Sequence, residues 1–127
     1  MVINVGRLKD GKIDYVRNEI ASVVKAAKGK TVKVIIETGL LTDEEKALAT
    51  RLSCEAGATF VKTCSGVSAG VATVQDIRLM KANLSGEVQL KASSGIRTYE
   101  DAMALIEAGA TRLGTSAGMK IIEGSKQ

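Results

Sequence analysis

The chain has 127 residues, of which 45% are hydrophobic, and its formal net charge is +4. This length suits a single domain that can bury a core, and the charge suits an anionic substrate as well as a solvated lysine-rich surface. The chain has one Phe, two Tyr, no Trp and no His, which disfavours base stacking on nucleic acid and excludes imidazole bases, Ser-His and Cys-His nucleophile pairs and most zinc sites.

Segments with strand character alternate with helical patterns along the whole chain. In chain order the predicted elements are a strand over 1–5, a helix over 13–27, strand 32–37, helix 42–56, strand 58–62, helix 73–84, strand 88–91, helix 98–109 and strand 111–114. Apolar residues at helical spacing, capping motifs after Thr42 and Thr98 and glycine stops support the helices. Five short apolar strands separated by helices predict an α/β fold with a parallel sheet.

Two lysines, Lys62 and Lys91, each close an apolar run and open a loop rich in glycine and serine. A lysine at the end of a buried strand is costly unless it is solvated, paired or used. On neighbouring parallel strands the two cations would disfavour each other's charge, which lowers an amine pKa and favours a nucleophile. A lone lysine of this kind usually points to solvent, but the matched pair of loops favours a functional role.

The loops that follow the predicted strands carry groups that suit a phosphate. The candidates are Gly66, Ser94, Gly95, Arg97, Gly114, Ser116 and Gly118. They can supply backbone N–H groups, hydroxyls and one guanidinium, and the following helices begin where an anion is favoured. Glycine is common in such turns for conformational reasons alone, so the signal lies in the convergence of several loops beside two lysines.

The segment Glu55–Thr59 recurs as Glu107–Thr111, which indicates either one helix-to-strand turn used twice or duplicated βα units. In this alignment Lys62 falls on Gly114, so the turn itself does not demand the lysine. Of the two cysteines, we expect Cys54 to be a small core residue and Cys64 to be exposed. Without a secretory signal or a membrane span, we expect a cytoplasmic protein with reduced thiols and no membrane partner.

Several runs of the sequence resemble deoxyribose-phosphate aldolases, which are TIM-barrel enzymes. The matching segments are 1–6, 34–41, 60–63, 91–98 and 109–116. The resemblance implies a Schiff-base lysine at Lys62, a second lysine at Lys91 that keeps the first reactive, and phosphate contacts from Gly66, Ser94, Gly95, Arg97, Gly114 and Ser116. It also implies reversible cleavage of 2-deoxyribose 5-phosphate to acetaldehyde and glyceraldehyde 3-phosphate, as in deoxyribonucleotide catabolism, with no metal or cofactor.

The resemblance covers only the C-terminal part of that barrel. Three preceding strands are missing, as is the aspartate that usually stands just before the Met1–Asn4 run, and the family's paired glycines read Ser94-Gly95. We therefore expect residues 1–127 to form one domain, a partial TIM barrel of about five parallel βα units out of eight. A homo-oligomer or a complementing N-terminal half-chain would cover its open edges. A non-catalytic fragment that binds phosphosugars or serves assembly is the alternative to an aldolase.

Overall fold

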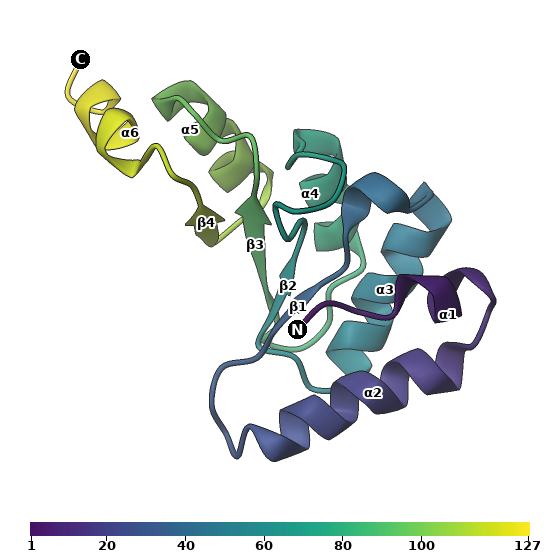
Figure 1. Ribbon diagram of the computed structural model, residues 1–127. Coiled ribbons are helices and arrows are strands. Elements are labelled where there is room, and N and C mark those ends of the chain that lie inside the picture. Colours follow the sequence, from purple (N-terminus) through teal and green to yellow (C-terminus); the bar gives the residue numbers. More distant parts are fainter.

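Four short runs of residues form a parallel sheet in the computed structural model, which describes residues 1–127 (Figure 1). The strands are β1 (Lys33–Ile35), β2 (Phe60–Lys62), β3 (Gln89–Ser93) and β4 (Arg112–Gly114). They lie side by side in chain order, and every neighbouring pair is parallel. The predicted α/β fold and its parallel sheet are confirmed.

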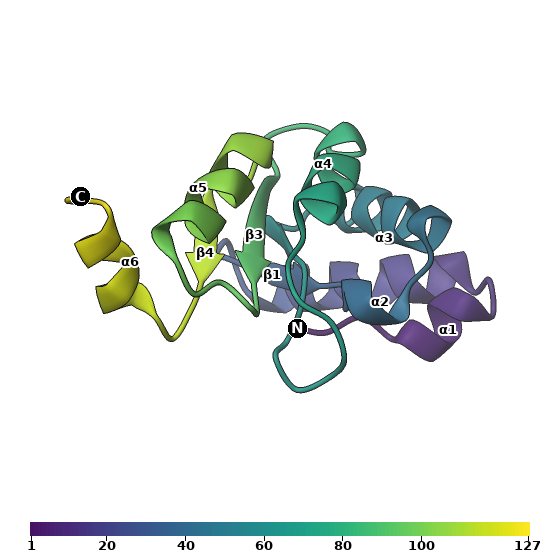
Figure 2. The same ribbon diagram turned by 90° about the horizontal axis from the view of Figure 1, so that it is seen from above.

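Helices connect these strands along the chain. They are α1 (Val5–Lys9), α2 (Ile13–Ala26), α3 (Asp43–Glu55), α4 (Val74–Ala82), α5 (Tyr99–Ala108) and α6 (Gly118–Gly124), with a short 3-10 turn, η1 (Thr38–Leu40), after β1. Seen from above, α1 and α6 lie at opposite ends of the row of helices (Figure 2). None of these helices combines the length and the apolar character that a bilayer crossing requires.

The predicted first strand is the main correction to the sequence-based fold. Instead of a strand over 1–5, the structure has one isolated parallel bridge between Val2 and Ile35. The chain then leaves the sheet because the side chain of Asn4 accepts a hydrogen bond from the backbone N–H of Arg7 and caps helix α1. The sheet therefore has four strands and an N-terminal bridge, not five strands.

The capping motifs that predicted two helices form as expected. In α3 and α5 the side chains of Thr42 and Thr98 accept hydrogen bonds from the N3 backbone, and the acids Glu45 and Asp101 bond back to the cap. Each arrangement satisfies backbone N–H groups that the first helical turn would otherwise leave without partners. These caps fix where each helix starts, and therefore also where the loop from the preceding strand ends.

The sheet buries one face against the helices and leaves the other face mostly polar. Val34, Val61 and Leu90, one from each of three strands, are fully buried in a single core of 21 residues. The neighbouring positions Lys62 and Lys91 are half-buried and point to the opposite side, because side chains alternate along a strand. In a closed barrel this second face would be the lumen.

Candidate active site

Lys62 and Lys91 are direct neighbours across the sheet. They are paired in the register of β2 and β3, each half-buried on the polar face. Burial lowers the pKa of the Lys91 amine, and the nearby charges of Lys62, Lys33 and Arg112 lower it further. The structure thus brings the two predicted lysines together among other cations.

Arg112 extends this cationic row to the last strand. It is the register partner of Lys91 on β4, and its guanidinium carbon lies 4.6 Å from the centre of the Phe60 ring. The guanidinium covers part of the Phe60 ring, which is only 5% exposed although it faces the open side of the sheet.

A pocket of about 440 Å³ opens beside Lys62 at the carboxyl ends of β2, β3 and β4. Its lining residues are Lys62, Ser65, Gly66, Ser93, Ser94, Gly95, Ile96, Arg97, Gly114, Thr115 and Ser116. Every predicted phosphate-binding residue of the resemblance is among them, whereas Gly118 belongs to α6 and lies outside. Lys91 does not line the pocket, although it adjoins Lys62.

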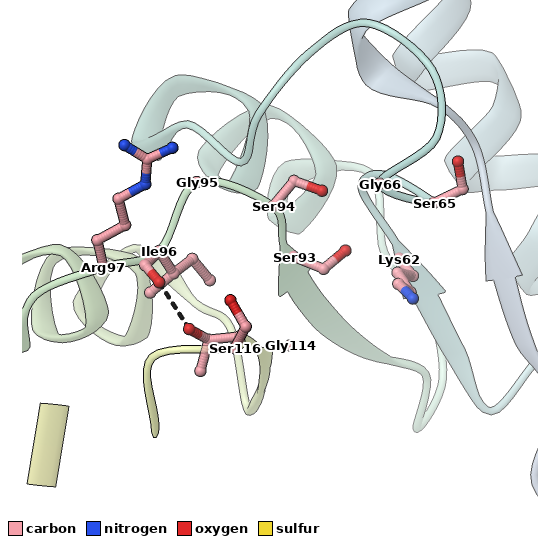
Figure 3. A pocket seen from close by; sticks show the side chains of 11 residues that line it. Lys62, Ser65, Gly66, Ser93, Ser94, Gly95, Ile96, Arg97, Gly114 and Ser116 are labelled. Atoms are coloured by element: carbon pink, nitrogen blue, oxygen red, sulfur yellow. Dashed lines mark hydrogen bonds between the residues drawn. The ribbon is translucent and has the colours of Figure 1, made fainter. Parts of the chain in front are cut away.

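The close-up shows how the pocket is spread (Figure 3). Lys62 lies at one end with Ser65 and Gly66 nearby, and the side chain of Arg97 lies at the other end. The serine and glycine loop after β3 runs between them. An elongated anionic molecule could therefore place one end at the amine and its charge farther along the pocket.

Hydrogen bonds hold the β2 and β3 loops together beneath this pocket. The Thr63 hydroxyl donates to the Ser93 carbonyl and accepts from the Ser93 N–H, both at 3.1 Å, and the Ser93 hydroxyl donates to the Cys64 carbonyl at 2.6 Å. The loop then turns through two left-handed residues, Ser94 with φ 79° and Gly95 with φ 77°.

Gly114 leaves room for the lysine beside it. A Cβ built at this position would lie 3.1 Å from Lys91 Cε and 3.0 Å from Ser93 Cβ. The position that aligns with Lys62 in the internal repeat therefore has no side chain, and the space is taken by Lys91. Lys62 and Gly114 each end a three-residue strand, as the alignment of the repeats implies.

Sequence reasoning missed some residues of the pocket and misjudged both cysteines. Ser65, Ser93, Ile96 and Thr115 line the pocket beside the predicted residues, and their positions within the same loops were the available signal. Cys64 is 1% exposed, not open to solvent, and its sulfur lies 3.4 Å from the hydroxyl of Thr38, the first residue of η1. Cys54 is only half-buried in α3 and stands outside the main core.

Comparison with known proteins places this geometry in an aldolase class. The chain matches the DeoC/LacD family aldolase model over residues 1–124. It is 58% identical to a deoxyribose-phosphate aldolase of Thermococcus gammatolerans over 128 residues, covering 99% of this chain and 57% of that protein. A deoxyribose-phosphate aldolase of Staphylococcus carnosus is 57% identical over 124 residues, covering 98% and 56%.

Solved structures agree with the sequence match. A protein described as a candidate deoxyribose-phosphate aldolase of Coccidioides immitis superposes with a TM-score of 0.94 at 40% identity, covering 100% of this chain and 51% of that one. The tetrameric deoxyribose phosphate aldolase of Aeropyrum pernix gives a TM-score of 0.81 at 35% identity, covering 91% and 50%. The chain belongs to the DeoC/LacD family of aldolases and corresponds to part of their TIM barrel. It spans a little over half the length of the curated relatives it matches.

Proposed function

We propose that this chain carries the amine chemistry of a Schiff-base aldolase that acts on 2-deoxyribose 5-phosphate. The observation that supports the proposal best is the pairing of Lys91 with Lys62, which lines a pocket rich in backbone N–H and hydroxyl groups. A Schiff base needs a neutral amine near neutral pH, and crowding by cations favours one. The pocket beside that amine suits the phosphate of the same substrate.

In the proposed reaction the Lys62 amine attacks the aldehyde carbon of the open-chain sugar, and loss of water forms an imine. The protonated imine then accepts the electron pair released when the bond between the second and third carbons breaks. The hydroxyl on the third carbon gives up its proton as glyceraldehyde 3-phosphate leaves, the remaining enamine takes up a proton on carbon, and water hydrolyses the resulting imine to release acetaldehyde from the lysine. The imine serves as the electron sink, so these steps need no metal or cofactor.

The assigned residues divide between the two ends of the substrate. Lys62 is the proposed nucleophile, and Lys91 is its electrostatic partner. The phosphate would lie in the loops that carry the remaining predicted residues, namely Gly66, Ser94, Gly95, Arg97, Gly114 and Ser116. Charge makes a sugar phosphate costly to move through a bilayer, and this supports a cytoplasmic location for the reaction.

A non-catalytic phosphosugar-binding or assembly fragment is the second candidate. The observation that favours it is the pocket of backbone N–H and hydroxyl groups, which lies wholly within this chain and would suit a phosphate whether or not an imine forms. Incubation with 2-deoxyribose 5-phosphate and detection of released acetaldehyde separates the two candidates. An aldolase releases acetaldehyde in proportion to protein and loses this activity in Lys62→Ala. A binding fragment releases none, while the sugar phosphate still shifts the amide resonances of Gly66 and Gly95.

A further inference from the structure

Glu37 is a buried carboxylate that neither the predicted site nor the proposed reaction uses. It follows β1, is 5% exposed, and has a left-handed backbone with φ 57°. That conformation is rare for a residue other than glycine and costs about 1–3 kcal/mol where it occurs. A strained, buried acid in this position calls for a compensating set of contacts.

Those contacts all come from the loop after Lys62. The Glu37 carboxylate accepts hydrogen bonds from the Ser65 backbone N–H at 2.6 Å, from the Ser65 hydroxyl at 2.8 Å and from the Ser68 hydroxyl. Burial opposes ionisation of Glu37, but these donors and the charge of Lys62 prevail, and the pKa of the carboxyl lies below its ordinary value. Charge-assisted hydrogen bonds of this kind are about twice as strong as neutral ones.

The backbone on both sides of Glu37 fixes its place beside the lysine strand. The N–H groups of Ile36 and Thr38 donate to the carbonyls of Lys62 and Thr63, each at 3.0 Å. Farther along, Gly39 lies so close to the loop that an added Cβ would be 2.1 Å from the Ala69 carbonyl oxygen. The loop is thus held against η1 by Glu37 at its start and by this close approach at its end.

We infer that Glu37 is a positioning residue whose carboxylate holds the 65–68 loop in the form that builds the Lys62 end of the anion pocket. Ser65 and Gly66 line that pocket, whereas Glu37 and Ser68 do not. The inference deepens the proposed function and rests on it for the identity of the natural ligand. A preorganised loop lowers the entropic cost of anion binding, and this effect on anion affinity can be measured without turnover.

The decisive experiment measures the dissociation constant of sulfate from the amide shifts of Gly66 and Gly95. Glu37→Gln keeps the size and the backbone strain of the residue but removes the charge that the three donors share. We expect sulfate binding to weaken at least about tenfold, the effect of losing one charged hydrogen bond. Glu45→Gln is the matched control, because Glu45 is also a hydrogen-bonded carboxylate but caps α3 away from the pocket, and it should bind sulfate like the parent.

Ser68→Ala is a second variant, which weakens the same network without changing the buried residue Glu37. Ser68 is half-buried and outside the pocket, so weaker sulfate binding in this variant would act through Glu37. The double variant with Glu37→Gln should bind sulfate no more weakly than Glu37→Gln alone, because both changes break one network.

Parent-like sulfate affinity in Glu37→Gln or in Ser68→Ala overturns the inference, and so does a parent protein that binds no sulfate. Additive losses in the double variant also count against it. Absence of acetaldehyde release from a parent that binds sulfate normally would contradict the aldolase reaction and leave the role of Glu37 standing.

Discussion

Ser94 occupies a backbone position that glycine would fill with less strain. Its φ of 79° lies in the left-handed region, where an L side chain is disfavoured. We expect Ser94→Gly to raise the free energy of unfolding by about 0.5–1 kcal/mol, since relief of this strain outweighs the added freedom of glycine in the unfolded chain. Urea denaturation measures the change. Gly95→Ser is the opposite exchange at the next position, where φ is 77° and an added Cβ would lie 2.8 Å from Val71, so it should destabilise the protein.

Lys91 should make the stability of the protein depend on pH in the alkaline range. Its pKa is lowered in the folded chain, first by burial and then by Lys62, Lys33 and Arg112, whereas in the unfolded chain it returns toward the ordinary 10.5. Between these two values the unfolded chain binds more protons at Lys91, so stability contributed by this residue rises with pH.

The apolar variant Lys91→Met removes this dependence. The variant's advantage in unfolding free energy over the parent should be largest below the lowered pKa and should shrink as the pH approaches 10.5. Denaturation curves of both proteins over this range test the point, and an advantage that grows with pH would show that the sign is wrong. Alkaline groups far from Lys91 cancel in the difference because both proteins share them.

Capping motifs are the elements on which the positions of the site loops depend. Thr98 accepts a hydrogen bond from the Asp101 N–H, and Asp101 bonds back to the N–H groups of Arg97 and Thr98. Thr98→Ala should lower the free energy of unfolding by about 1 kcal/mol, the usual effect of losing such a cap. The amide resonance of Arg97 should shift as well, because its N–H donates to Asp101, and Arg97 lines the pocket. Thr73→Ala, which removes the cap of α4, is a comparison with a similar expected cost in stability and no pocket residue in the cap.

The predictable part of the structure is the part whose signals are local. Capping boxes and strands are indicated by residues close together in the sequence, and the pairing of Lys62 with Lys91 follows from their places on adjacent parallel strands. Helix α6 escaped prediction because it starts at Gly118 with no side-chain cap on Ala117. The left-handed Glu37 and the buried Cys64 depend on contacts between separate loops, which no local pattern encodes.

The whole molecule presents an open side that a complete barrel would enclose. Strand β4 has a neighbour only on the β3 side, and β1 meets only the short N-terminal bridge on its outer side. Val2 is 44% exposed there, and on the terminal helix Met119 and Ile122 are 79% and 59% exposed. Unpaired edges and apolar patches of this kind favour association with another chain.

We therefore expect a homo-oligomer, most simply a dimer, unless an N-terminal half-chain completes the barrel first. Light scattering at low micromolar concentration should give a mass of at least twice the 13.3 kDa of one chain. Adding the N-terminal half of a related aldolase should shift the mass toward a one-to-one complex if the barrel can be completed in trans. A cooperatively folding monomer that does not bind the added half-chain would show that the exposed edges need no cover.

The central claim, that Lys62 is an imine-forming nucleophile activated by its neighbour, is tested most directly by borohydride trapping with acetaldehyde followed by peptide mapping. We predict a single adduct on Lys62 in the parent, none in Lys62→Ala, and a slower trapping rate at neutral pH in Lys91→Leu, because that variant removes the cation paired with Lys62. An adduct on Lys91 in the parent, or no adduct on a folded parent protein, would contradict the account.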